Sequence, residues 1–151
     1  MYKKSLTHHI TKIVIDLLFY LSIICVAFVP VFSRWLFGWI NYADSDHLKA
    51  FTIILFSSGI CCIYILFILK RMYRSLLSGN PFIDENVCHL RKIAVLCAII
   101  SLIYIIKCFF MFTFATIVIA AVFVVGCLFC LTLKDLFKQA INYKSENELT
   151  I

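Results

Sequence analysis

The chain has 151 residues, of which 64% are hydrophobic and 15% charged, and its formal net charge is +6. Soluble domains are about 45–50% apolar and about 25% charged, so this composition excludes a soluble enzyme, a nucleic-acid-binding domain and a disordered tail. Four apolar segments of roughly 20 residues, each able to cross a bilayer, would occupy a little over half of the chain. We therefore expect a single-domain, all-α integral membrane protein, a bundle of four transmembrane helices.

Stretches with almost no charge predict the four spans, because a backbone in lipid must pair its own polar groups within a helix. The spans are expected at about 13–33, 50–69, 92–111 and 115–133. The last two come from one long apolar stretch that would measure about 60 Å as a single helix, twice the thickness of the hydrocarbon layer. We expect it to fold back near Lys107, Thr113 and Thr116. Residues 70–91 then form a loop and 134–151 a tail.

The basic residues predict the orientation, because short cytoplasmic loops are enriched in Lys and Arg. Eleven of the fourteen fall in the amino-terminal segment, the 70–91 loop and the tail: Lys3, Lys4, Lys12, Lys70, Arg71, Arg74, Arg91, Lys92, Lys134, Lys138 and Lys144. Only Arg34, Lys49 and Lys107 belong to the opposite side, where Trp35 and Trp39 are typical of a membrane interface. We therefore expect a multi-pass protein of the cell membrane with both termini in the cytoplasm.

The 70–91 loop contains signals for a helix end and a helix start. Gly79 suits the end of the second helix. Asn80 and Pro81 suit the cap and first residue of the third helix, with Asp84 and Glu85 in its first turn, where the helix dipole favours acidic groups. In the tail, apolar residues at amphipathic spacing predict that the fourth helix extends into the cytoplasm before residues 145–151: Leu133, Leu136, Phe137, Ala140 and Ile141.

Two blocks in these cytoplasmic segments resemble a known family. The first consists of Asn80, Pro81, Phe82, Glu85, Asn86, Leu90, Arg91, Lys92 and Ile93. The second, Glu146, Asn147, Glu148, Leu149, Thr150 and Ile151, is similar to a Glu-Asn-Asp-Leu-Thr-Ile ending. Both resemble an uncharacterised bacterial membrane-protein family, domain of unknown function 2975. The resemblance implies four helices, a pair of cytoplasmic motifs and a helix-turn-helix regulator as partner, but no known chemistry.

Cysteines and histidines are the first candidates for chemistry. Cys127 and Cys130 form a Cys-x-x-Cys pair, the spacing of redox proteins. They lie close to the cytoplasm, which keeps thiols reduced, so we interpret them as small residues that pack between helices. Two adjacent pairs, His8–His9 and Cys88–His89, could meet on zinc. Structural zinc sites space their ligands more widely, so solvated histidines are the preferred interpretation, and we expect no metal and no cofactor.

Charged groups near the cytoplasmic interface are the remaining candidates. Asp16 is the one acidic residue inside a span, which makes it a candidate for a proton or substrate role. We instead expect it to pair with Lys12, or with Arg91 or Lys92 at the same interface. The basic residues near Lys70 are expected to contact anionic headgroups.

These observations lead to three functional hypotheses. The first is a non-enzymatic regulatory or accessory membrane protein, in which the 80–91 segment and the carboxyl-terminal tail dock a cytoplasmic protein such as a transcription regulator. The docking of the tail on the 80–91 segment could equally be purely structural. The second is a small transporter or channel subunit that acts as a homo-oligomer around Asp16. The third is a membrane thiol-redox protein. Direct nucleic-acid binding is not expected.

Overall fold

The computed structural model describes the backbone of residues 6–40, 45–77, 82–110 and 112–148, and side chains within 10–35, 48–77, 82–110 and 112–146. Four α-helices account for nearly all of them: α1 (Leu6–Ile40), α2 (Ser45–Leu77), α3 (Asp84–Phe110) and α4 (Phe114–Glu148). All four helices are long and apolar enough to cross a membrane. The predicted all-α fold with four membrane-spanning helices is therefore confirmed.

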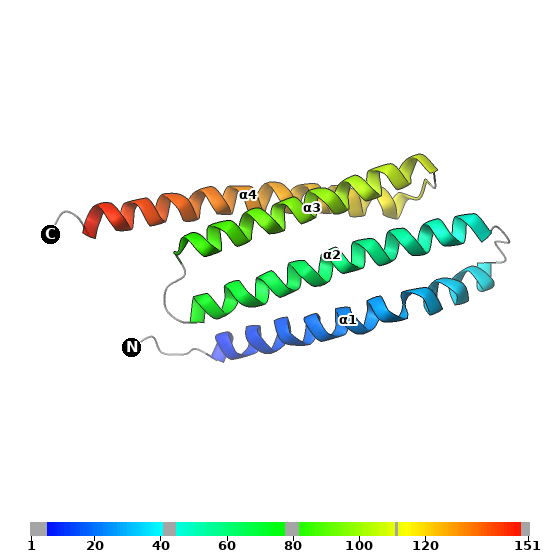
Figure 1. Cartoon of the computed structure of the whole chain (residues 1–151), viewed down its shortest axis with the longest axis horizontal. Coiled ribbons are helices and arrows are strands. Elements are labelled where there is room, and N and C mark those ends of the chain that lie inside the picture. The colour runs from blue at the N-terminus through cyan, green and yellow to red at the C-terminus, as the bar shows by residue number, and fades with distance from the viewer. Residues whose placement is uncertain (1–5, 41–44, 78–81, 111, 149–151) are drawn as a thin grey trace.

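The helices run antiparallel along one axis, each beside its neighbour in the chain (Figure 1). α1 and α3 begin at the same end of the bundle at which α2 and α4 finish. We call this end the terminal end and the opposite one the far end. Close backbone contacts join α1 to α2, α2 to α3 and α3 to α4. Among the described residues α1 has such contacts with α2 only, so the bundle is open on its α1 side.

The helices are longer than the spans expected from the charge-free stretches. α1 and α4 have 35 residues each, which corresponds to about 50 Å. α1 continues past Pro30 to Ile40, and α2 starts at Ser45. The helical backbone therefore continues past both expected span ends, and residues 41–44 between α1 and α2 lie outside the described part of the chain. Charged residues indicate where a helix leaves the hydrocarbon layer. They do not indicate where the helix ends, because a helix can continue into water.

Three helix boundaries at the turns also needed correction. α3 begins at Asp84, with Asp84 and Glu85 in its first turn; Gly79, Asn80 and Pro81 lie outside the described residues. The backbone N–H of Asn86 donates to the backbone carbonyl of Ile83 at 3.0 Å, and this hydrogen bond closes the turn that leads into α3. α4 continues to Glu148, into the segment expected to be a tail. Lys107 lies in the last turn of α3 and not in the turn between α3 and α4.

The core follows one face of α3. Its buried residues recur every three or four positions, which is the spacing of a helix packed between two others: Asn86, Leu90, Ile93, Cys97, Ile100 and Tyr104. We call this set the α3 seam. Two hydrogen bonds fix the neighbours against it. Ser101 Oγ donates to the carbonyl of Ala120 on α4 at 3.3 Å, and Ser58 Oγ of α2 lies 3.3 Å from Tyr104 Oη.

α1 and α2 approach each other closely where α2 has no side chain. A Cβ atom placed on Gly59 would lie only 2.5 Å from Val26 Cγ2, so only glycine fits there. Nearer the far end, the hydroxyl groups of Ser33 and Thr52 are hydrogen-bonded at 2.9 Å. Small residues and hydroxyl bonds are the usual means of helix association in lipid, where apolar surface alone gives little preference for another helix.

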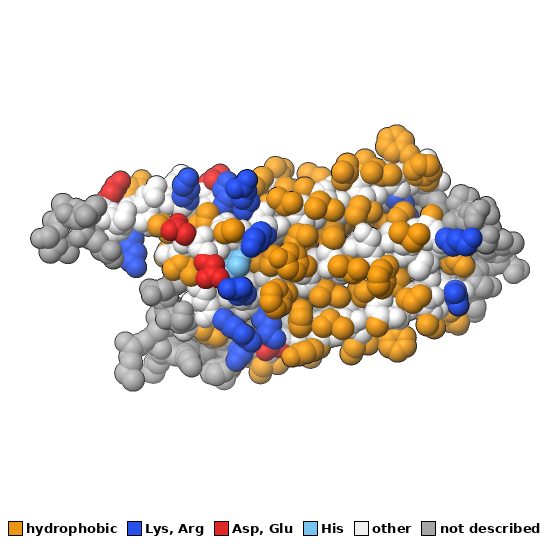
Figure 2. Space-filling model, in the orientation of Figure 1, with side chains coloured by type: hydrophobic (Ala, Val, Ile, Leu, Met, Phe, Trp, Pro, Cys, Tyr) orange, Lys and Arg blue, Asp and Glu red, His pale blue; other side chains and the backbone are white. Residues whose placement is uncertain are grey.

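The outer surface has an apolar band between two charged ends. Figure 2 shows hydrophobic side chains along most of the visible face, with Lys and Arg gathered at the terminal end together with Asp and Glu. Exposed residues of this band include Leu17, Ile53, Val122 and Phe129. A surface of this kind is typical of contact with lipid tails. The four apolar helices thus fit a multi-pass membrane protein that contacts the bilayer.

Candidate functional site

A polar cluster joins α2 and α3 at the terminal end. Asn86 is 1% exposed, and its Nδ2 donates to Ser75 Oγ of α2 at 3.2 Å. Next to Asn86 in the sequence, Glu85 places its Oε1 2.8 Å from Nη2 of Arg71, which lies one turn before Ser75 on α2. The first turn of α3 is therefore tied to the last turns of α2 by one amide hydrogen bond and one ion pair. Loss of the Asn86 amide would remove a buried hydrogen bond, which is costly, whereas the side chains of Arg71 and Glu85 are more than half exposed and their pair contributes less.

His89 lies inside this cluster and not in solvent, so the expectation of a solvated histidine was wrong. The residue is only 6% exposed. Neither ring nitrogen makes a hydrogen bond within the described residues, although Nε2 is 3.6 Å from Glu85 Oε1. The sequence did contain a signal for this position. His89 is one turn from Asn86 and adjacent to Leu90, so the periodicity of the α3 seam places it on the buried side.

An aromatic contact joins the first predicted motif to the amphipathic extension of α4 that precedes the second one. The rings of Phe82, just before α3, and Phe137 of α4 lie 5.3 Å apart between centroids. On α4, Phe137, Ala140 and Ile141 are half-buried, whereas Leu136 is 54% exposed. Leu136 was expected on the packed face, but it lies on the exposed side of α4, next to the residue that contacts Phe82.

The other predicted motif residues divide into buried, exposed and undescribed ones. Leu90 is buried in the α3 seam, while Arg91 and Glu146 are exposed. The following residues lie outside the described part or have no described side chain: Asn80, Pro81, Asn147, Glu148, Leu149, Thr150 and Ile151. The contact between Phe82 and Phe137 thus links the first motif to the α4 extension; the second motif lies mostly outside the described side chains.

Asp16 is paired, but with a different partner from those expected. Its Oδ1 lies 2.8 Å from Lys70 Nζ of α2, and not beside Lys12, Arg91 or Lys92 at ion-pair distance. Lys70 is further held by two rings of α1, since its Nζ lies 5.2 Å from the centroid of Phe19 and 5.3 Å from that of Tyr20. Lys70 occupies this position because α1 packs directly on α2, which sequence distance does not reveal.

Cysteines contribute to the core. All eight are free, and Cys97 of the α3 seam packs with Cys127 and Cys130 of α4. Within the part of the chain that the structure describes, no three His, Cys, Asp or Glu side chains gather as metal ligands. The side chains of His8 and His9 lie outside that part.

Sequence reasoning missed three members of the site. Ser75, the partner of Asn86, and Arg71, the partner of Glu85, both come from α2, where the sequence showed only a helix end and a basic group. Their positions follow from the antiparallel contact between α2 and α3. The third is His89, which a helical register continued along α3 from Leu90 toward Asn86 would have placed on the buried side.

Comparisons with known proteins give one match. Neither the curated proteins nor the solved structures gave a match. A family model described as "Protein of unknown function (DUF2975)" matches residues 9–151, which covers α1 from residue 9 onward, the other three helices and both motif blocks. This is the family that the two blocks resemble, so that expectation is confirmed. The chain therefore belongs to the DUF2975 family of proteins of unknown function.

Proposed function

We propose that this protein is a non-enzymatic, multi-pass protein of the cell membrane that docks a cytoplasmic protein at its terminal end. The contact between Phe82 and Phe137 carries the proposal. Through it, the segment before α3 and the extension of α4 share one surface, although they are far apart in the sequence. A small helix-turn-helix regulator is the partner that the family resemblance suggests, and its activity would then be controlled by retention at the membrane.

Exposed apolar residues on this surface support protein docking. Phe82, Leu136 and Tyr143 are 45%, 54% and 67% exposed. They lie beyond Lys70 and Lys134, the basic residues that border the apolar band, so lipid tails would not cover them. Aromatic residues that remain exposed in a polar surrounding are enriched at protein interfaces.

The length of α4 supports the same conclusion. From Lys134 to Glu148 the helix continues for about 20 Å beyond the apolar band. An extension of that length cannot be needed for crossing the bilayer, whose hydrocarbon layer is about 30 Å thick. It carries charged residues of both signs, among them Asp135, Lys138 and Glu146, which suits a partner protein better than a uniformly anionic lipid surface.

The orientation is part of the proposal. The positive-inside rule places the side with more Lys and Arg in the cytoplasm, and eleven of the fourteen belong to the termini and the α2–α3 connection. The terminal end of the bundle would then face the cytoplasm, where a transcription regulator is found.

The transport and redox hypotheses receive less support. A proton or substrate role for Asp16 requires a carboxylate that can exchange its partner, and the bond to Lys70 supports a structural role instead. Likewise, the packing of Cys127 and Cys130 against Cys97 supports a role in helix association.

Co-purification tests the proposal. The tagged full-length chain is produced together with the small helix-turn-helix protein encoded nearest to it, and the complex is isolated in a mild detergent. We expect a complex of defined stoichiometry with the intact chain. A chain that ends at Tyr143, and separately Leu136→Glu, should lose at least about tenfold in affinity, because a charge would enter the centre of the interface.

The matched control is Asn142→Glu, which adds the same charge at an exposed position of the α4 extension, on a different side of the helix from Leu136. This variant should retain the partner. Retention of the partner by Leu136→Glu, or equal loss in both variants, would contradict docking at the proposed surface.

A further inference from the structure

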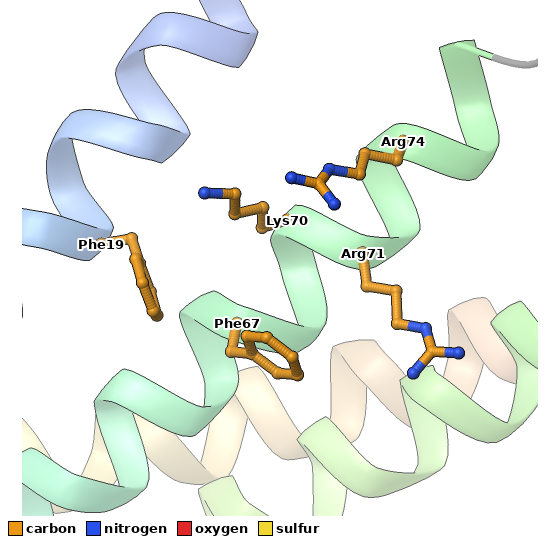
Figure 3. A pocket seen from close by; sticks show the side chains of 5 residues that line it. All are labelled: Phe19, Phe67, Lys70, Arg71 and Arg74. Carbon is orange, nitrogen blue, oxygen red and sulfur yellow. The ribbon is translucent and has the colours of Figure 1, made fainter.

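A hollow of about 360 Å³ opens beside α2 at the border between the apolar band and the terminal end. Its lining consists of Phe19 of α1 and of Phe67, Lys70, Arg71 and Arg74 of α2. Figure 3 shows that the lining has two halves. The two rings lie toward the apolar band, and the three basic side chains lie toward the terminal end, so the hollow is itself amphipathic.

The basic half has more positive charge than its neighbours neutralise. A smaller adjoining hollow, lined by Lys12, Asp16, Lys70 and Arg74 among others, continues it toward α1. Among the described residues, Asp16 pairs with Lys70 and Glu85 with Arg71, which leaves Lys12 and Arg74 without an ion-paired carboxylate in that part of the chain. Arg74 makes no ion pair or hydrogen bond with any described residue. An anion bound here would balance the remaining charge, and the fork of an arginine suits a phosphate group.

The apolar half continues away from the charges along the surface. The rings of Phe19 and Phe67 lie 6.4 Å apart between centroids, and Tyr64 stacks on Phe67 at the same distance. Phe67 and Tyr64 are exposed and lie, respectively, about one and two turns deeper in the apolar band than Arg71. A bound molecule therefore needs an anionic head at Arg74 and an apolar chain that can follow these rings.

We propose that the hollow binds one anionic phospholipid, with its phosphate at Lys70 and Arg74 and an acyl chain along Phe67 and Tyr64. Basic pockets between membrane helices at the cytoplasmic side are a known mode of lipid recognition. The site lies between α1 and α2, apart from the surface formed by Phe82 and Phe137, and it does not depend on the proposed docking of a protein.

Lipid titration of the purified full-length chain tests this site. The chain in neutral detergent is titrated with phosphatidylglycerol or with phosphatidylcholine, and bound lipid is counted by native mass spectrometry. We expect one saturable phosphatidylglycerol. Arg74→Gln should weaken it about tenfold, which corresponds to about 1.4 kcal/mol. Arg74→Lys, which keeps the charge, should lose less. The matched control Lys92→Gln removes an exposed charge of α3 outside the hollow and should change affinity by less than about twofold.

Three results would overturn the proposal. Equal weakening by Lys92→Gln would mean attraction by overall charge. Equal binding of phosphatidylcholine would mean that the basic half selects nothing. If inorganic phosphate displaces the lipid at a concentration as low as that at which the lipid binds, the ligand is a soluble phosphate. The melting temperature of Arg74→Gln in phosphatidylcholine should equal that of the parent chain. If it is lower, Arg74→Lys and Lys92→Gln are compared instead. If neither of these two variants binds phosphatidylglycerol more tightly than phosphatidylcholine, the proposed site is also contradicted.

Discussion

Asn86 is a polar residue in an otherwise apolar seam. Its amide donates to Ser75 and is almost completely buried. A single buried asparagine in a helix interface fixes the register of the helices, because any other alignment leaves the amide without a partner. At this position the bond determines which turn of α2 faces the first turn of α3.

Removal of this amide gives the first prediction. Asn86→Ala should lower the free energy of unfolding by about 1–3 kcal/mol, because Ser75 loses a buried partner and a small cavity forms. Unfolding in mixed micelles, followed by tryptophan fluorescence, measures the change. Thr132→Ala removes an exposed hydroxyl that bonds only to its own helix and should stay within about 0.5 kcal/mol. Equal stability of Asn86→Ala and the parent would refute the structural role.

The pair of Asp16 and Lys70 gives the second prediction. Asp16→Asn and Lys70→Gln should each lower the melting temperature in micelles, since each leaves one charge without its partner at the edge of the apolar band. The double variant should melt above the additive expectation, because it leaves no uncompensated charge. Additive losses would show that the two groups do not interact. Lys92→Gln, which removes an exposed charge of α3 that makes no ion pair within the described residues, is the control.

At the level of whole helices, the close approach of α1 and α2 gives the third prediction. Gly59→Ala should destabilise the chain by about 1–3 kcal/mol, because its Cβ would overlap Val26. Adding Val26→Ala should restore most of the loss. Gly126→Ala is the matched control, since a Cβ there would be 3.8 Å from Cys97 Sγ, an ordinary contact. Unfolding in micelles measures all four chains, and a tolerated Gly59→Ala would contradict the packing.

The helices themselves could be predicted from the sequence, whereas their rotations could not. Charge-free stretches indicated four helices, and the acidic first turn of α3 was found from Asp84 and Glu85. The partner of Asp16 was missed because three basic residues lay at a similar depth, and the choice among helices depends on contacts such as that of Gly59 with Val26. The position of Leu136 was missed because two rotations of α4 satisfy the same apolar spacing.

For the whole molecule, the distribution of basic residues gives the fourth prediction. Alkaline phosphatase fused after Ile151 should be inactive, because the terminal end is expected in the cytoplasm, where its disulfides do not form. The same enzyme fused after Thr113, at the far end between α3 and α4, should be active. A fluorescent protein fused after Ile151 checks expression. Activity of the fusion after Ile151 would place the termini outside and would also exclude a cytoplasmic partner.

The arrangement of the helices has a consequence for how the molecule assembles. Each close helix pair consists of chain neighbours, so no helix must wait for a distant one before it can pack. Such local contacts keep the entropy of loop closure small and favour rapid folding. α1 and α2 can associate as soon as both have been synthesised, and α3 and α4 can follow as a second hairpin. The membrane then receives two preformed pairs, and the bond of Asn86 to Ser75 aligns the later pair on the earlier one.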